Sequence, residues 1–509
     1  MNKVFDVVVA GAGPVGLMLA CELRLAGAEV LVVERLSEMD PTIKSGAINV
    51  PTAQAFDRRG LLPALLTRHQ AALEVIKAFV GGVMDTADRP PIGGHFAGIM
   101  LPFDVIDEDD PAFAGVGPAG RAVLVNQQGI EEILGAWAAE LGVPVRRGVE
   151  LTDLVDHGDA VTVWCGDESI RGAWLVGCDG GRSTVRKLAG FDFPGIDPEI
   201  TGRQAVVEMS GTEGLQRGWH DTDNGIYAYG PNPGRFLTVE LDGPPADRDA
   251  PITAAELEAS LRRVTGVPVH ITAVHSATRF TDNTRQVPDY RKNRVLLAGD
   301  AAHVHSPFGG QGLNLGIGDA VDLGWKLGAV VAGRMGEELL DTYTAERYPI
   351  GAWVLEWTRA QVALMRLDRR SKALREVMVE LLSTGDGATA VFKRISGVLH
   401  RYHLGGDHPL VGAVVPELNL SDGSRVAEHF TAGTGVLFDF ADSAELRAAA
   451  ARWQDRIRIV TAKSLDPIDA TAALVRPDGY VAWAAGNGGT AGNSDLTAAL
   501  HRWFGTPMR

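Results

Sequence analysis

A glycine-rich turn near the N-terminus places the strongest constraint on the fold. Gly11, Gly13 and Gly16 lie in the segment GAGPVG, between the apolar run FDVVVA and the amphipathic run LMLACELRLAG. The first run is typical of a central parallel strand and the second of a helix. The run AEVLVVER, residues 28–35, predicts the next strand. The sequence therefore predicts a βαβ unit and, with it, a parallel sheet.

The same turn predicts a dinucleotide site. Glycines allow a tight turn and a close approach of the backbone to a pyrophosphate, and the helix N-terminus supplies N–H groups and positive dipole. Glu34 ends the second strand 34 − 16 = 18 residues after Gly16, close to the expected ~20. It is placed to accept hydrogen bonds from an adenosine ribose. Arg35 fits stacking near adenine and a solvated surface position equally well.

Two further glycine-rich loops follow apolar strands. Asp179 and Gly180 begin the segment DGGRSTVR after WLVGC; taken alone, this segment fits a ligand loop and a capped helix with two surface arginines equally well. Asp300 ends RVLLAGD, and the loop SPFGGQG, residues 306–312, then enters a helix. Free N–H groups at that helix start favour an anionic ligand. Three such loops indicate one site at the carboxyl edge of the sheet.

Charge and cysteine content exclude several classes of function. The 509-residue chain has 48 basic and 64 acidic residues, a net charge of −16, so we expect it to bind neither nucleic acid nor an anionic membrane. Its three cysteines form no CxxC pair, which argues against a disulfide framework and against a metal site, zinc above all. No ~20-residue apolar span is present. We expect a soluble, cytoplasmic protein.

The three loops together resemble those of the single-component, FAD-dependent aromatic hydroxylases, which have the para-hydroxybenzoate hydroxylase fold. The resemblance rests on GAGPVG with Glu34, on GCDGGRSTVR and on GDAAHVHSPFGGQGLNLGIGDAVDLGWKL, and it spans residues 4–328. HPLVGAVVPELNL and VRPDGYVAW look like the branch that acts on phenols and aromatic polyketides, as in antibiotic biosynthesis. That branch carries a C-terminal thioredoxin-like domain. No CxxC follows residue 400, which excludes redox work there and leaves a structural or dimer-related role.

The expected fold class is α/β. The resemblance implies an FAD-binding Rossmann-like domain of the glutathione-reductase type, an inserted, mostly antiparallel β substrate domain and the thioredoxin-like domain. Alternating stretches between Pro/Gly turns in 189–282 also indicate antiparallel strands. We expect a monomer or a homodimer. The expected boundaries are 1–76, 101–188 and 283–350 for the FAD-binding domain, 77–100 and 189–282 for the substrate domain, 351–400 for a helical linker, and 401–509 for the C-terminal domain.

The resemblance also implies a set of cofactor contacts. It assigns the FAD pyrophosphate to the first loop, the ribityl-pyrophosphate part to Asp300, and the flavin C2 carbonyl to the backbone at 312–314. Pro307, whose carbonyl would lie near the reacting edge of the flavin, is the expected catalytic position. The expected cofactor residues are Gly11, Gly13, Gly16, Glu34, Arg35, Lys44, Arg121, Gln127, Asp179, Gly180, Asp300, Pro307, Gly312, Leu313 and Asn314.

Lys44 is a departure from the family pattern. The family usually has arginine at this place, and lysine keeps the charge but loses the planar fork. The resemblance therefore leaves open whether the flavin moves or a phosphate is held there. No second GxGxxG is present, in keeping with a family that has no separate nicotinamide domain.

The implied reaction is a hydroxylation. NADPH (or NADH) would reduce FAD, and O2 would form a flavin C4a-hydroperoxide that transfers one oxygen atom to a small aromatic, polycyclic polyketide-type substrate. Baeyer–Villiger insertion, epoxidation and oxidative ring rearrangement by the same flavin remain open. So does a non-catalytic FAD-binding protein that shelters an intermediate. The WxWxIP pattern of flavin halogenases is absent.

The substrate is expected between the FAD-binding domain and the 189–282 sheet. Aromatic residues at alternating strand positions are also typical of an ordinary core, so the assignment rests on position alone. His303 and His305 flank the third loop and are expected to be mainly structural, because the chemistry requires no histidine. The expected substrate contacts are Phe96, Met100, Trp219, Tyr227, Tyr229 and Phe236.

Overall fold

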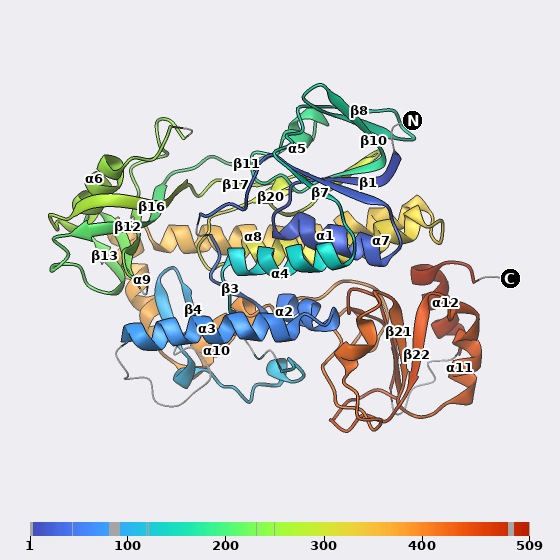
Figure 1. Ribbon diagram of the computed structural model, residues 1–509. Coiled ribbons are helices and arrows are strands. Elements are labelled where there is room, and N and C mark those ends of the chain that lie inside the picture. The colour runs from blue at the N-terminus through green and yellow to red at the C-terminus, as the bar shows by residue number, and fades with distance from the viewer. Residues whose placement is uncertain are drawn as a thin grey trace.

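An eight-stranded sheet forms the centre of the N-terminal part of the chain (Figure 1). The computed structural model describes residues 4–42, 44–80, 92–118, 120, 122–230, 232–248, 250–486 and 493–507. In the sheet, β1 pairs in parallel with β2 and β10, and β7 and β19 extend it in parallel. The α/β class and the first βαβ unit are confirmed. The strands of this sheet are β1 (Val4–Ala10), β2 (Val30–Glu34), β7 (Val145–Arg147), β8 (Asp153–Asp156), β9 (Val161–Cys165), β10 (Glu168–Gly177), β18 (Arg291–Lys292) and β19 (Val295–Leu297).

Helices α1 (Pro14–Leu25) and α7 (Gly312–Val331) pack closely against each other beside this sheet. Both helices are buried on most of their surface, and most of their buried residues are apolar. Two glycines of α7 permit the crossing. A Cβ on Gly324 would lie 2.4 Å from the Glu22 Cβ, and one on Gly328 would lie 2.3 Å from the Ala26 Cβ.

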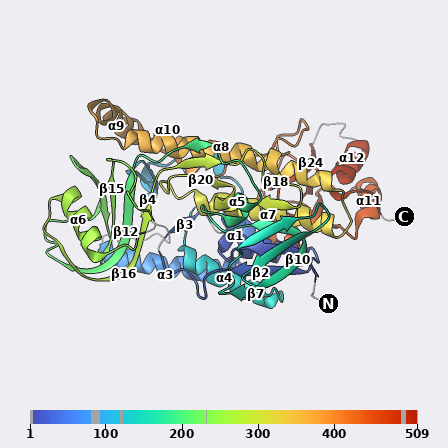
Figure 2. The same ribbon diagram turned by 90° about the horizontal axis from the view of Figure 1, so that it is seen from above.

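A separate five-stranded antiparallel sheet lies at one end of the molecule (Figures 1 and 2). Helix α6 (Ala254–Thr265) covers one face of this sheet with a small apolar core. We call the opposite face the inner face, because its side chains share an apolar cluster with Phe308. The strand order is β13 (Gly218–Thr222), β14 (Gly225–Tyr229), β15 (Arg235–Glu240), β12 (Thr201–Ser210) and β16 (His270–Phe280).

Short strands and long helices join the two sheets. Strands β11 (Gly195–Ile196), β17 (Thr284–Gln286) and β20 (His303–Val304) form a small antiparallel sheet between them. Helix α8 spans much of the molecule's length (Figure 2) and crosses the domain boundary that we expected at residue 350. The connecting helices are α2 (Val50–Arg58), α3 (Leu62–Val80), α4 (Gln127–Glu140), α5 (Thr184–Leu188), α8 (Asp341–Leu364), α9 (Arg369–Leu382) and α10 (Gly385–Ile395).

Two short antiparallel strand pairs complete this part. In the segment that begins with the region 77–100, which we assigned to the substrate domain, β4 (Ile92–Phe96) and β5 (Ile99–Pro102) form a hairpin. The hairpin packs into the apolar cluster of the inner face. Strands β3 (Ala47–Ile48) and β6 (Val123–Leu124) also pair.

The C-terminal part has its own mixed sheet. Strand β21 (Gly435–Asp439) pairs in parallel with β22 (Ile457–Thr461) and antiparallel with β23 (Ala472–Val475), which pairs with β24 (Val481–Ala485). Helices α11 (Ala444–Ala450) and α12 (Asn493–Phe504) contact each other, and α12 also contacts β24. The three cysteines of the chain are free.

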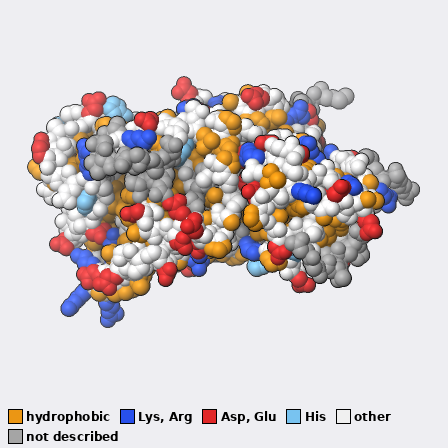
Figure 3. Space-filling model, turned by 90° about the horizontal axis from the view of Figure 1, so that it is seen from below, with side chains coloured by type: hydrophobic (Ala, Val, Ile, Leu, Met, Phe, Trp, Pro, Cys, Tyr) orange, Lys and Arg blue, Asp and Glu red, His pale blue; other side chains and the backbone are white. Residues whose placement is uncertain are grey.

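The described surface and helices agree with the composition. On the face seen from below, acidic and basic side chains are interspersed with apolar ones, and no broad basic patch is visible on the described atoms (Figure 3). Among the described helices, none combines the length and the apolarity that a membrane crossing requires.

Candidate functional site

The three glycine-rich loops meet at the carboxyl edge of the large sheet. The Cys178 N–H donates to the Ala10 carbonyl (2.8 Å), and the Ala298 N–H donates to the Gly177 carbonyl (3.0 Å). These bonds join the ends of β1, β10 and β19. The convergence of the loops, which three separate sequence patterns predicted, is therefore observed in the structure.

The glycines of the first loop are needed for different reasons. Gly11 has a φ of +107°, and a Cβ there would lie 2.4 Å from the Cys178 carbonyl oxygen; a Cβ on Gly16 would lie 1.9 Å from the Gly11 carbonyl oxygen. The fold itself requires these two glycines. Gly13 is different: its φ is −73°, and a Cβ there would meet nothing within 4 Å. The protein leaves open space at Gly13, the N-cap of α1, where the backbone can approach a ligand.

Glu34 points back toward this loop from the end of β2. It accepts hydrogen bonds from the N–H groups of Ala12 and Leu36, both at 2.8 Å. Its half-buried carboxylate is thus oriented by the backbone next to the open space. Arg35 is exposed.

The second loop caps the helix that follows it through the side chain of Asp179. Asp179 accepts from Ser183 Oγ (2.5 Å) and from the N–H of Thr184 (2.7 Å) at the start of α5. Burial, the largest effect on this carboxyl, raises its pKa despite these bonds. Gly180 follows with a φ of +80°. The capped-helix interpretation therefore describes the Asp179 side chain, and its backbone and Gly180 remain the candidates for cofactor contact.

Arg186 is not the surface arginine that the capped-helix interpretation assumed. It is buried, donates to the carbonyls of Ala301 (2.9 Å) and Gly181 (2.8 Å), and stacks on Phe193 with its guanidinium carbon 3.8 Å from the ring centre. Arg186 thus ties the second loop to the third. An arginine four residues after another gave no sequence signal for this role.

The third loop presents donors and one carboxylate to the same edge. Helix α7 has no side-chain cap, and its first three N–H groups, at residues 312–314, have no acceptor within the described chain. Asp300 is exposed, and its carboxylate forms no hydrogen bond to any described group. A Cβ on Gly312 would lie 3.4 Å from His305 Nε2 and 3.9 Å from Asp300 Oδ1. Open donors, Asp300 and His305 are therefore grouped at the start of α7.

Side chains from distant segments hold this loop in place. Asn314 accepts from the Asn49 N–H (2.9 Å) and donates to the Gly310 carbonyl (3.0 Å). Gln361, on α8, donates to the Phe308 carbonyl (3.2 Å) and accepts from the Ala97 N–H (2.9 Å). Gln361 therefore links the loop to the β4–β5 hairpin, a role that no local motif predicted.

Pro307 is exposed at the tip of the third loop. Its carbonyl accepts a hydrogen bond from the Gly310 N–H at 3.2 Å. The neighbouring Phe308 is buried in the inner-face cluster, so the loop is anchored on one side of Pro307. The position of Pro307 near the open donors of α7 is compatible with the expected catalytic role, which stays a prediction.

The two histidines of the loop are fixed by different contacts. His303 Nε2 lies 2.7 Å from Asp319 Oδ2, which also accepts from the Gly299 N–H, and Arg347 Nε donates to Asp319 Oδ1 at 2.7 Å. Burial opposes ionisation of Asp319, but His303 and Arg347 outweigh it and keep its pKa below the usual value. Burial lowers the pKa of His305, which favours a neutral ring. His303 thus has the structural role that we expected.

The remaining expected cofactor residues are Lys44, Gln127 and Arg121. Lys44 is exposed, and its ammonium pairs with Asp40 at 2.8 Å. Gln127, the first residue of α4, donates to Glu131 Oε1 at 2.8 Å. Arg121 lies outside the described residues.

The expected substrate residues divide between the two faces of the five-stranded sheet. Tyr227, Tyr229 and Phe236 face α6: Phe236 belongs to the core under that helix, and Tyr229 is its cross-strand partner. For these three residues the ordinary-core interpretation holds, because strand residues two apart point to the same face. Their neighbours Ile226, Leu237 and Val239 occupy the inner face instead.

Aromatic side chains from other segments surround Phe308. The ring of Trp219 lies 6.3 Å from that of Phe308, and the ring of Phe280 lies 6.0 Å from it. Phe96 is buried in the same cluster. Met100 is half-buried and faces His95 across the hairpin. Of the expected substrate residues, the structure thus brings Phe96 and Trp219 near the third loop.

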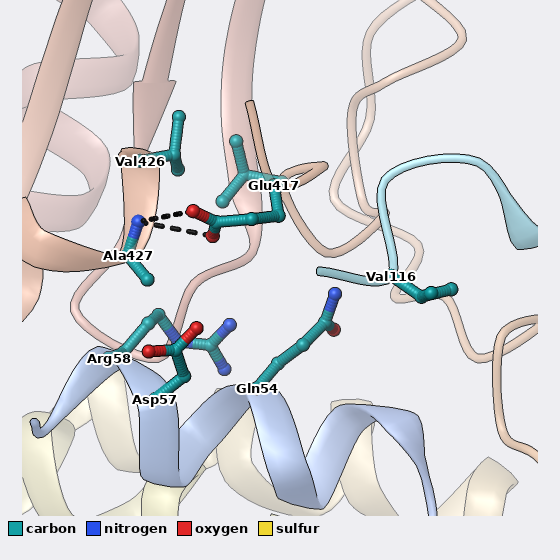
Figure 4. A pocket seen from close by; sticks show the side chains of 8 residues that line it. Gln54, Asp57, Arg58, Val116, Glu417, Val426 and Ala427 are labelled. Carbon is teal, nitrogen blue, oxygen red and sulfur yellow. Dashed lines mark hydrogen bonds between the residues drawn. The ribbon is translucent and has the colours of Figure 1, made fainter. Parts of the chain in front are cut away.

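A small cavity lies between α2 and the C-terminal part (Figure 4). Glu417 accepts from the Ala427 N–H there (3.2 Å to Oε2) and from Arg425 Nη1 (3.0 Å). The cavity has room for a single water. Its lining is Gln54, Asp57, Arg58, Val116, Val415, Glu417, Val426 and Ala427.

Glu417 gives the junction a pH-dependent stability. Burial raises its pKa to about 7, although Arg425 and the Ala427 N–H favour the charged form. The pKa of Glu417 in the folded protein is above its value in the unfolded chain. The stabilisation by protonated Glu417 is therefore complete below the unfolded pKa, and it is lost as pH rises through about 7. We expect Glu417→Gln to remove a pH-dependent stability difference on the order of 2–3 kcal/mol.

Thermal unfolding of both proteins between pH 5.5 and 8.5 would measure this effect. The wild-type melting temperature should fall further than that of Glu417→Gln across this range. Parallel curves for the two proteins would show that Glu417 titrates as an ordinary surface carboxyl.

Comparisons with known proteins agree with this geometry. Residues 4–358 match the family described as "FAD binding domain", and residues 408–507 match the one described as "Aromatic-ring hydroxylase, C-terminal". A 12-dehydrotetracycline 5-monooxygenase/anhydrotetracycline 6-monooxygenase from Streptomyces rimosus subsp. rimosus is 43% identical over 530 residues, which cover 99% of each chain. A dialkyldecalin synthase from Streptomyces rugosporus is 37% identical over 98% of each chain. The solved structure of an anhydrotetracycline hydroxylase from Streptomyces rimosus superposes with a TM-score of 0.85 at 41% identity, covering 99% of this chain and all of the other.

Proposed function

The chain belongs to the family of FAD-binding aromatic-ring hydroxylases, and we propose that it hydroxylates a polycyclic aromatic substrate of polyketide type. One oxygen atom of O2 would enter the substrate, with NADPH or NADH as the reductant. The relative named for two tetracycline monooxygenations supports this substrate class, because it matches the whole chain. The observation that carries the proposal is the group of open backbone donors at the start of α7 beside Asp300, whose carboxylate forms no hydrogen bond to any described group.

The residues at the carboxyl edge fit FAD. The open space at Gly13 suits a pyrophosphate at the N-terminus of α1, and Glu34 is oriented toward the neighbouring ribose position. The N–H groups at 312–314 would meet the C2 carbonyl of the ring system. FAD, once reduced and supplied with O2, provides the activated oxygen atom for transfer to the substrate.

The chain's own residues then have three tasks. The dipole and open N–H groups of α7 stabilise negative charge at the pyrimidine edge of the cofactor. Phe308 and the aromatic rings around it exclude water from the space next to Pro307. Neutral His305, with Nε2 close to Gly312, offers one polar group for orienting a phenol.

A second candidate function follows from one relative. The dialkyldecalin synthase is 37% identical over 98% of this chain, and its name denotes synthesis of a dialkyldecalin. An FAD-holding scaffold that shelters and positions an intermediate is therefore the alternative. Such a scaffold would retain the open space at Gly13 and the open N–H groups of α7, since both features concern only the binding of the cofactor.

The finer fold assignment is part of the same proposal. We infer a glutathione-reductase type cofactor domain from the parallel strands around β1. A thioredoxin-like C-terminal domain is supported by one parallel and two antiparallel strand pairs with helices α11 and α12. The absence of CxxC gives that domain no thiol chemistry.

The proposal is tested by NADPH oxidation of the FAD-loaded protein with a panel of polycyclic phenols and quinones. Hydrogen peroxide is assayed in parallel, and products are analysed by mass spectrometry. We expect one compound to accelerate NADPH oxidation and to gain the mass of one oxygen atom with little peroxide. Consumption of a substrate without NADPH and without a mass gain would favour the alternative.

A further inference from the structure

Helix α9 (Arg369–Leu382) exposes several large apolar side chains. It lies at the outer edge of the molecule (Figure 2), and of its residues only Leu382 is buried. Surface helices normally turn their large apolar side chains toward the core. Four such side chains of α9 are instead between 45% and 56% exposed, and a contiguous apolar patch on a surface marks an interaction site. They are Leu374, Val377, Val379 and Leu381.

Three of these side chains form a narrow stripe along the helix. Leu374, Val377 and Leu381 are spaced by three and four residues, so they lie on one face, and we call them the α9 stripe. Arg370, four residues before Leu374, extends the same line. Val379 points to the opposite side of the helix, since it lies two residues after Val377. A seam with this spacing is typical of a helix that packs against a second helix.

Other contacts hold α9 on the rest of the chain and leave the stripe unused. Lys372 and Arg375 form ion pairs, at 3.1 Å and 2.7 Å, with aspartates on β13 and in the turn after it. Met378 and Leu382 supply the apolar contact, since both pack into the cluster around Phe308. The place of α9 in the fold is therefore fixed without the stripe.

The free charges of α9 are separated along the helix. Arg369 and Arg370 lie in its first turn, Glu376 and Glu380 lie in its second half, and all four are exposed. None of the four side chains forms an ion pair with any group that the structure describes. This distribution is the reverse of the one that stabilises an isolated helix, in which acidic residues favour the N-terminus and basic residues the C-terminus. The charges therefore need an explanation other than the stability of α9 itself.

A second copy of the same helix matches this pattern. When two copies run antiparallel across a twofold axis, the basic end of each lies beside the acidic end of the other. A parallel pair would place like charges together, and a partner of a single sign of charge would be repelled at one end of α9. Because the two directions are opposite, pairing Leu374 with Val377 of the second copy also pairs Arg370 with Leu381 of the second copy. Glu380 of the second copy then lies next to Arg370, whose aliphatic part covers apolar surface.

We propose that the α9 stripe binds the α9 stripe of a second copy of this chain, in an antiparallel twofold arrangement. A helix of 14 residues is about 21 Å long, so a contact confined to it buries less than the ~800 Å² per partner of a standard interface. The dimer is therefore weak, with a Kd on the order of 10 μM. The inference is independent of the proposed function, since neither cofactor nor substrate takes part in the contact.

Sedimentation velocity of the full-length, FAD-loaded protein, at concentrations from well below to well above this Kd, tests the contact. We expect the mass of the wild type to rise with concentration from that of one chain toward that of two. Val377→Glu should raise the Kd at least about tenfold, because it places a carboxylate in the middle of the apolar contact. Val379→Glu is the matched control, since it adds the same charge to the same helix on the opposite side, and it should keep the wild-type Kd. Both variants should melt within about 2 °C of the wild type, because both side chains are exposed.

A charge exchange tests the direction of the two helices. Arg370→Glu and Glu380→Arg, each alone, should raise the Kd about three- to tenfold, because each places like charges side by side. The double variant should return to within about threefold of the wild-type Kd. A wild type that stays a single chain at every concentration would overturn the inference and leave the stripe to a different protein. Equal association of Val377→Glu and Val379→Glu, or no recovery in the double variant, would also overturn it, because the dimer would then use another surface or another helix direction.

Discussion

Gly13→Ala is expected to fold normally and to lose FAD. The Cβ would meet no protein atom within 4 Å, and the backbone at Gly13 has an extended conformation that alanine adopts readily. The added methyl group would instead occupy the space through which a pyrophosphate approaches the N-terminus of α1. Each lost charge-assisted hydrogen bond costs about 1.5–3 kcal/mol, so we expect FAD affinity to fall on the order of 100-fold.

The measurement is FAD affinity by flavin fluorescence, together with the melting temperature of the apoprotein. The apoprotein should melt within about 2 °C of the wild type, because the change touches no packed group. Gly16→Ala is the matched control: its Cβ would lie 1.9 Å from the Gly11 carbonyl oxygen, so the apoprotein itself should be destabilised. Unchanged FAD affinity in Gly13→Ala would place the cofactor elsewhere.

Local sequence patterns predicted that the three loops meet at one edge, because each loop follows a strand. The glycine turns, Glu34 and Asp300 each stand at a strand end, and parallel strands bring their carboxyl ends to one edge. For the aromatic residues of the five-stranded sheet, the sequence did not predict which face each side chain occupies. Phe236 and Leu237 are adjacent, and nothing in the alternating pattern says which of the two faces α6.

Long-range contacts explain the other differences. Arg186 and Gln361 act through backbone carbonyls far along the chain, and such bonds depend on tertiary structure alone. The same is true of Arg476, which lies in the turn between β23 and β24. Its side chain is completely buried and crosses to the N-terminal part, where it binds Glu346. No local pattern indicates this contact.

A cluster of buried charges around Arg476 joins the two parts of the chain. Arg476 donates to Glu346 Oε2 (2.7 Å), to Asp322 Oδ1 (3.1 Å) and to Asp478, and Lys326 binds Asp322 (2.8 Å) and Glu346 (2.9 Å). The three carboxylates lie close enough together to hold a metal ion. The two cations already occupy that position, so we interpret the cluster as structural.

Arg476→Met is expected to be the most destabilising single change at this junction. It would leave three buried carboxylates with one cation, and breaking a buried ion pair on one side costs about 3–5 kcal/mol. Burial raises the pKa of Asp322, while Arg476 and Lys326 outweigh the burial of Glu346 and lower its pKa. Without Arg476, both carboxyls should have raised pKa values in the folded protein. The stability loss should therefore be smaller at pH 5.5 than at pH 8.

Urea unfolding and hydrogen exchange of β21–β24 at the two pH values would measure this effect. Asp322→Asn, added to Arg476→Met, should restore part of the stability at pH 8 because it removes one uncompensated charge. Arg458→Met, at an exposed position of β22, should change stability by less than about 0.5 kcal/mol. A pH-independent loss in Arg476→Met, with no recovery in the double variant, would mean that Arg476 stabilises the junction by packing against Trp325 and Trp503 and not by its charge.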